Sequence, residues 1–224
     1  MEKKVTVIIP ARNERKTIKY VIDIAMKNQS TDEVIVVNNN STDSTAKVAE
    51  KHGARVVDCE EVGKGNAMAK GLLEAKNDIV VFLDADILNY NESIVDTLSS
   101  PIINGEADFV KSTFDRTTGG TVTKIVVQPL LNILYPDLYK FQEPISGMIA
   151  CKKSILEKIK FESDYGVDIA IVLDLYNMGV KMKETNIGEI LNMSHKNKTT
   201  ETMAKMSYEI MKAIIKKAKE HGVY

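Results

Sequence analysis

Short apolar runs alternate with segments of helical periodicity through the first 86 residues. The β-branched and apolar runs predict strands at residues 5–9, 33–37, 55–57 and 78–83. Apolar positions three and four residues apart predict the intervening helices at residues 16–26, 42–52 and 65–75. Strands separated by helices of about ten residues indicate a mostly parallel sheet with helices on both faces.

The pattern is less regular after residue 86. It predicts helices at 94–99 and 167–178, strands at 108–112 and 145–151, an edge strand at 181–189 and a closing helix at 201–219. Pro129 interrupts and Pro136 ends an apolar segment between these elements. The closing helix has an apolar stripe, which is typical of a core or dimer contact; its members are Met203, Met206, Ile210 and Ile214. No repeat or linker divides the chain, so we expect one continuous α/β domain.

Composition is that of an ordinary globular protein, with 44% hydrophobic and 27% charged residues and a net charge of −1. This balance argues against a nucleic-acid surface, which would normally be basic. The apolar run at 79–83 is far too short to span a membrane, so we expect no transmembrane segment. Cys59 and Cys151 have no CxxC partner, which favours reduced thiols in a cytoplasmic protein.

Two carboxylates follow the strand predicted at 78–83, in the sequence Asp84-Ala85-Asp86. Ligand sites of parallel sheets lie at the carboxyl ends of the strands. Neighbouring carboxylates repel each other unless a cation compensates, and Mg²⁺ commonly bridges carboxylates to a diphosphate. The alternative is a solvated turn or a helix cap, because aspartate favours both.

Other polar segments occur where elements begin or end. Gly63-Lys64-Gly65 opens a helix, where glycines permit close approach of a ligand and the lysine could contact phosphate; a plain loop lysine is the alternative. Residues 10–14 and 38–43 follow the first two strands and could contact a base or ribose, or simply form turns and caps. His195 could complete a metal site or be an idle surface histidine.

In order and spacing, these segments resemble the GT-A type of nucleotide-sugar glycosyltransferase. The matching stretches in the first half are 5–14 (VTVIIPARNE), 32–43 (DEVIVVNNNSTD), 63–65 (GKG) and 78–86 (DIVVFLDAD). The second half narrows the resemblance to the glucosyl-3-phosphoglycerate synthases, through 110–112 (VKS), 119–123 (GGTVT), 128–131 (QPLL), 165–169 (YGVDI) and 195–198 (HKNK).

The resemblance implies a Rossmann-like GT-A domain over residues 1–224, with a nucleotide-binding half at 1–86 and an acceptor-binding half with the C-terminal helix at 87–224. It implies retaining transfer of a hexose from a nucleotide sugar, UDP-glucose by preference, to a small anionic acceptor such as 3-phosphoglycerate. The implied cofactor is Mg²⁺ or Mn²⁺, and the implied assembly is a homodimer.

The same resemblance assigns roles to individual residues. The donor contacts would be Pro10, Ala11, Arg12, Glu14, Asn39, Lys64, Asp84, Ala85 and Asp86. The acceptor contacts would be Gly120, Thr121, Thr123 and Asn197. Asp86 and His195 would bind the metal, and Asp84 and Asp168 would be the catalytic carboxylates, with Asp168 holding the sugar or acceptor.

Three positions depart from the family pattern. Thr121 stands in place of an arginine, so the acceptor loop lacks a bidentate anion contact. Met148 replaces a glutamate near the sugar site, and Asn38 replaces an aspartate. Lys124, Arg116 or Lys196 are candidates for the missing cation.

Other functions fit part of the sequence. Residues 143–150 (EPISGMIA) are similar to a segment of dolichol-phosphate mannose synthases, which implies inverting transfer to a polyprenyl phosphate. The altered acceptor loop also fits a nucleotide-sugar binder that has lost transfer activity. A nucleotidyltransferase is disfavoured, because the segment after the first strand, PARNERKT, contains no glycine.

Overall fold

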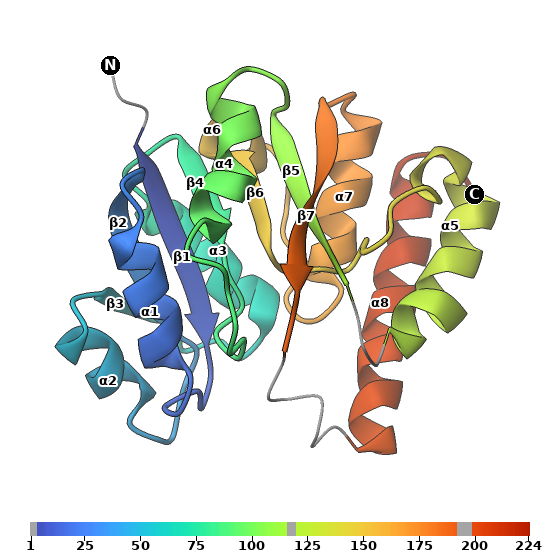
Figure 1. The fold of residues 1–224 in the computed structure, drawn as a ribbon. Coiled ribbons are helices and arrows are strands. Elements are labelled where there is room, and N and C mark those ends of the chain that lie inside the picture. Colours follow the sequence, from blue (N-terminus) through green and yellow to red (C-terminus); the bar gives the residue numbers. More distant parts are fainter. Residues whose placement is uncertain (1–3, 116–119, 192–198) are drawn as a thin grey trace.

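A seven-stranded sheet forms the centre of the molecule, with helices on both faces (Figure 1). The computed structural model describes residues 4–115, 120–191 and 199–224. The strands are β1 (Val5–Ala11), β2 (Thr31–Asn38), β3 (Arg55–Asp58), β4 (Ile79–Phe82), β5 (Phe109–Asp115), β6 (Ile149–Lys152) and β7 (Met182–Glu189). Their order across the sheet is β3-β2-β1-β4-β6-β5-β7.

The helices are α1 (Ile18–Lys27), α2 (Thr45–Lys51), α3 (Lys64–Glu74), α4 (Ile94–Ile103), α5 (Gln128–Leu134), α6 (Lys153–Leu156), α7 (Val167–Asn177) and α8 (Thr200–Glu220). A π-helical turn, η1 (Thr123–Val127), precedes α5, and a 3₁₀ turn, η2 (Pro136–Leu138), follows it. Two apolar clusters, one on each face of the sheet, pack the strands against the helices. Ile8 belongs to the cluster that includes residues of α3, α7 and α8, whereas its neighbours Val7 and Ile9 belong to the cluster that includes residues of α1 and α4, as the period of two in a strand requires.

The path of the chain creates a switch point beside β1. The chain proceeds outward from β1 to β2 and β3, then returns to place β4 on the other side of β1. All of these pairings are parallel, so the carboxyl ends of β1, β2 and β4 meet at one edge of the sheet. Sheets of this type bind ligands at such a switch point.

Strand β6 breaks the parallel pattern, because it runs antiparallel to both β4 and β5. Strand β6 is also shorter than the strand predicted at 145–151. The residues before Ile149 form a turn instead, in which Ser146 N donates to Glu143 O at 3.0 Å. The predicted edge strand at 181–189 is confirmed, as β7 pairs with β5 at the end of the sheet.

The prediction that Pro129 interrupts its segment is wrong. Pro129 lies in the first turn of α5, where a helix needs no amide donor, so the π-helical turn continues directly into α5. The chain does change direction at Pro136, which begins η2.

Helix α8 is fixed to α7 by a buried polar cluster. Asp174 Oδ2 of α7 forms an ion pair with Lys217 Nζ at 2.8 Å, and Asp174 Oδ1 lies 3.0 Å from His221 Nε2. The His221 Nδ1 atom is 2.9 Å from the Tyr135 hydroxyl. Cutting a buried charge from its partners is costly, so this cluster holds the C-terminal helix in place.

The predicted apolar stripe of α8 divides between two environments. Ile210 and Ile214 are buried in the core, whereas Met203 and Met206, nearer the start of the helix, are half-buried and line the cavity described below. In the part of the chain that the structure describes, no helix is both long and apolar enough to cross a bilayer. Cys59 and Cys151 are unpaired and buried, and burial raises the pKa of the Cys151 thiol well above its usual range, so it stays protonated.

Candidate functional site

A cavity of about 710 Å³ opens at the switch point. Strand β1, the loops after β2 and β4, and the start of α3 form one side of it, and residues 120–123, 145–148, 164–168 and α8 form the other. It gathers every predicted site residue within the described ranges: Pro10, Ala11, Arg12, Glu14, Asn39, Lys64, Asp84, Ala85, Asp86, Gly120, Thr121, Thr123 and Asp168. His195 and Asn197, with the candidate cations Arg116 and Lys196, lie outside the described residues.

Lys64 is shared between two carboxylates at the centre of this cavity. Its Nζ atom is 2.8 Å from Asp168 Oδ2 and 3.2 Å from Asp84 Oδ1. Burial lowers the pKa of Lys64, but the charges of Asp168 and Asp84 outweigh burial and raise it above its ordinary value. The lysine therefore stays charged, and it joins residues that come from α3, from the end of β4 and from α7.

The glycines around Lys64 contact the protein's own main chain. A Cβ atom on Gly63 would overlap Ser163 O, and one on Gly65 would overlap Glu162 O. Asn66 N also donates to Ser163 O at 3.1 Å. These glycines therefore let α3 begin directly against the segment that leads into α7, and Gly63 also lines the cavity.

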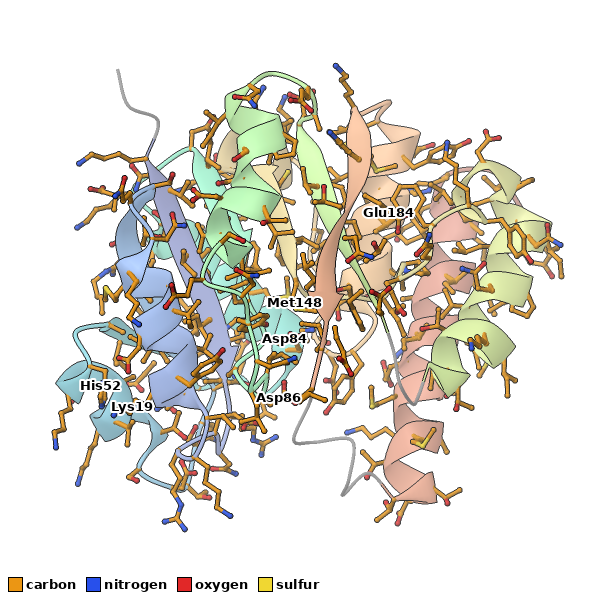
Figure 2. All side chains as sticks on the ribbon, in the orientation of Figure 1. Lys19, His52, Asp84, Asp86, Met148 and Glu184 are labelled. Atoms are coloured by element: carbon orange, nitrogen blue, oxygen red, sulfur yellow. The ribbon has the colours of Figure 1, made fainter. Side chains whose placement is uncertain are left out.

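Gly147 approaches the same ion cluster from strand β6's side. A Cβ atom at this position would overlap both Lys64 Nζ and Asp84 Oδ1. The next residue, Met148, is 2% exposed and lines the cavity, so an apolar thioether stands beside the ion cluster. Figure 2 shows Met148 close to Asp84, with Asp86 further toward the sheet edge.

Tyr90 supports Asp84 from behind. Its hydroxyl accepts from Asp84 N and donates to Asp84 O, both at 3.1 Å, while the Tyr20 hydroxyl donates to Tyr90 O at 2.7 Å. These bonds fix the main chain of Asp84 without occupying its carboxylate. In the turn after β4, the main chain of Asp84 is therefore held by Tyr90 while the residue lines the cavity.

Negative charge accumulates at the mouth of the donor half. Burial, followed by the nearby charge of Asp86 and smaller contributions from Asp43 and Asp84, raises the pKa of Glu14 to about 7. A divalent cation would relieve this repulsion, and carboxylate oxygens suit Mg²⁺ or Mn²⁺. Among the described residues no three metal-binding side chains converge, so Asp86 would need further ligands, such as diphosphate oxygens or His195.

Asn39 both lines the cavity and holds its wall together. Its amide donates to Glu61 O at 2.7 Å, and its oxygen accepts from Gly63 N at 2.9 Å. Asn13, in a left-handed conformation with φ 60°, accepts from Thr42 N at 2.8 Å. Both polar segments predicted from the sequence thus form structured turns, and the turns themselves make the donor wall.

Part of the cavity wall was not predicted. Helix α8 contributes Met203, Lys205, Met206 and Ile210 to the lining, opposite the donor side. Their helical spacing resembles that of core residues, so the sequence offered no distinct signal for this role. Lys124 does not line the cavity, whereas Lys205 of α8 does.

The chain matches the model of glycosyl transferase family 2 over residues 6–164 and belongs to that family. It is also similar to curated glucosyl-3-phosphoglycerate synthases. That of Petrotoga mobilis is 31% identical over 98% of this chain and 74% of the relative, and that of Mycobacterium tuberculosis is 32% identical over 94% and 72%. The predicted resemblance is confirmed, and the chain is a glycosyltransferase that uses a nucleotide-sugar donor.

Solved structures agree with this assignment. The M. tuberculosis enzyme in complex with Mn²⁺, UDP-glucose and phosphoglyceric acid has a TM-score of 0.90 and 33% identity, covering 97% of this chain and 80% of that one. Its complex with Mg²⁺ and UDP also has a TM-score of 0.90, at 32% identity and the same coverage. The expected GT-A fold is confirmed, and the relatives bind the expected metals.

Glu14→Gln should stabilise the protein at pH 8 but not at pH 5. The folded-state pKa of Glu14 is raised from 4.5 to about 7, so the folded protein favours the protonated, neutral side chain. The stability that protonation of Glu14 contributes is fully present below pH 4.5 and is lost as pH rises through 7. Glutamine removes the partly buried charge. We expect a gain of about 1 kcal/mol, or a melting temperature higher by about 2–4 °C, after allowing for solvent screening.

Thermal melts at the two pH values measure this difference. Glu106→Gln is the control, because Glu106 is exposed and pairs with Lys183 at 2.7 Å, so its replacement gives no gain at pH 8. Equal stabilisation by Glu14→Gln at pH 5 and pH 8 would contradict the assignment.

Proposed function

We propose that this enzyme transfers glucose from UDP-glucose to 3-phosphoglycerate, or to a closely similar small phosphorylated acceptor, with retention of anomeric configuration. The carrying observation is that the donor and acceptor residues within the described ranges line one cavity. Similarity to glucosyl-3-phosphoglycerate synthases over nearly the whole chain, acceptor half included, supports the proposal.

In this proposal, residues 1–86 hold the nucleotide. Pro10, Ala11, Arg12 and Asn39 form the wall against the uridine, with Glu14 close to the ribose and diphosphate. When bound, Mg²⁺ or Mn²⁺ supplies positive charge to the diphosphate, and Asp86 with His195 would hold the ion. Asp84 and Asp168, held in place by their ion pairs with Lys64, orient the glucosyl group through its hydroxyls.

The carboxylates near the acceptor side of the cavity support the proposal of retention. Within the described residues, the buried carboxylate on that side is Asp168, and Lys64 already occupies one of its oxygens. We propose that the acceptor hydroxyl gives its proton to the departing phosphate oxygen on the same face of the sugar. The anomeric carbon–phosphate oxygen bond breaks while the carbon–acceptor oxygen bond forms, so no protein base is required.

The acceptor phosphate needs a cation that Thr121 cannot supply. We assign this contact to Lys205, which lines the cavity from α8. Its side chain is 68% exposed, and its ion pair with Asp164 is long, at 3.9 Å, so the ammonium is available to a ligand. Gly120, Thr123 and Asn197 would complete the acceptor site, in keeping with the family resemblance.

We also propose a homodimer in the cytoplasm. Exposed apolar side chains gather on η1, α5 and α8, among them Ile125, Ile133 and Tyr208, which supports a contact with a second copy through the C-terminal half. The two unpaired cysteines support a reducing location.

The test is product analysis after incubation with UDP-glucose, Mg²⁺ and 3-phosphoglycerate. The proposal expects glucosyl-3-phosphoglycerate whose anomeric proton, read by NMR, retains the α-configuration of the donor. Transfer to a polyprenyl phosphate with a β-linked product would instead favour the inverting alternative. Donor binding without transfer to any acceptor would contradict both and favour a binding protein.

Lys205→Met should raise KM for 3-phosphoglycerate about tenfold, because a charge-assisted contact to the phosphate is lost. KM for UDP-glucose should change little. Lys212→Met removes an exposed lysine from the same helix outside the cavity lining and is the matched control. Steady-state kinetics with each substrate varied measures both constants. An unchanged KM for the acceptor would remove Lys205 from the site.

A further inference from the structure

Lys111 is a fully buried lysine that the proposed reaction leaves unused. It lies in the middle of β5, paired with Ile149 of β6 on one side and Glu184 of β7 on the other, and is 0% exposed. Residues 109 and 111 of a strand point to the same face. Phe109 packs in the cluster beneath α7 and α8, so Lys111 is directed under α7.

Packing does not account for a lysine at this position. The ammonium donates to Asp168 O at 3.2 Å, and within the described residues it forms no ion pair. Burying an ammonium with so few partners is costly, and an apolar side chain would fill the same space at lower cost. The lysine therefore carries a cost in stability that a role at the neighbouring site would explain.

That neighbouring site is the ion cluster around Lys64. The main-chain oxygen that Lys111 contacts belongs to Asp168, whose Oδ2 atom accepts from Lys64 at 2.8 Å. Asp168 Oδ1 is buried and has no hydrogen-bond partner. Asp168 is thus held at two points: Lys64 contacts its carboxylate from the cavity side, and Lys111 contacts its main-chain oxygen in the first turn of α7.

Charges of alternating sign continue from the cavity into the sheet. The groups that face Lys111 are Asp168 on α7, Lys64 on α3, Glu184 on β7 and Asp84 after β4. Glu184 is itself held, because its carboxylate accepts from Gln142 N at 2.9 Å. Figure 2 shows Glu184 on the β7 side, away from Asp84 and Asp86.

We propose that Lys111 is a positioning residue, whose charged ammonium fixes Asp168 and thereby aligns Lys64 and Asp84 for the nucleotide-sugar donor. It touches neither substrate nor reacting atoms. The inference rests on donor binding alone, and so is independent of the acceptor proposed above.

Such a role makes donor affinity depend on the charge of Lys111. Burial lowers the pKa of this lysine to about 8, with Asp168 and Glu184 opposing the effect and Lys64 adding to it. The ammonium is then charged at pH 7 and largely neutral at pH 9. Arginine stays charged throughout this range, and methionine never carries a charge.

The experiment is calorimetric titration of UDP-glucose, with Mg²⁺, into the whole protein at pH 7, 8 and 9. Every protein compared, the reference included, carries Glu14→Gln, because Glu14 lines the same cavity and its pKa of about 7 would add a pH dependence of its own. The reference affinity should fall about fivefold across this range, in step with loss of a single proton near pH 8. Lys111→Met should bind about tenfold more weakly at pH 7 and lose this pH dependence. Lys111→Arg should keep the affinity at pH 7 and also lose the dependence. Lys183→Met, on the exposed side of β7, should follow the reference.

Two results would overturn the proposal. One is Lys111→Met with the reference affinity and pH dependence. The other is Lys111→Met and Lys111→Arg with equal losses and the reference pH dependence, which would indicate a packing role only. If Lys111→Met does not fold, as thermal melts will show, Lys111→Arg decides alone by keeping or losing the pH dependence.

Discussion

One shared lysine connects the parts of this protein that form its proposed donor site. Lys64 begins α3, and its ammonium lies between Asp84, at the end of β4, and Asp168, in the first turn of α7. Asp168 is buried and the other two members of this ion cluster are partly buried, so displacement of any member leaves a charge poorly compensated. The close contacts around the cluster follow from this constraint. Gly63 and Gly65 let α3 meet the segment before α7, and Gly147 leaves room for the ammonium itself.

The same constraint explains how the two halves of the chain form one cavity. The parallel strands β1, β2 and β4 bring the donor wall to one sheet edge. Antiparallel β6 then returns the chain beside β4, which places residues 145–148 against the ion cluster. Helix α8 closes the far side, held by the buried contacts of Asp174 with Lys217 and His221. The two walls of the cavity, which we propose bind donor and acceptor, therefore depend on contacts between segments distant in sequence.

The sequence predicted most of the donor half, because its signals are local. Each parallel strand is a short apolar run, and polar residues such as Asp84 and Asn39 follow directly at its carboxyl end. The second half was less predictable for physical reasons. Nothing local shows that β6 runs antiparallel, and Met203 and Met206 have the spacing of core residues although they line the cavity. Gly147 and Lys111 matter through distant partners, which a single sequence does not reveal.

Donor binding by Gly147→Ala tests the central claim most directly. The added methyl group would overlap Lys64 Nζ and Asp84 Oδ1, so these two side chains must shift, and we expect the shift to disturb their ion pair while both charged residues stay in the chain. Gly105→Ala is the control, because its Cβ meets no atom and only the strain of φ +75° is added. Calorimetry with UDP-glucose and Mg²⁺ should show an affinity at least tenfold lower for Gly147→Ala and unchanged for Gly105→Ala. Wild-type affinity in a folded Gly147→Ala protein would show that the donor site does not depend on the shared lysine.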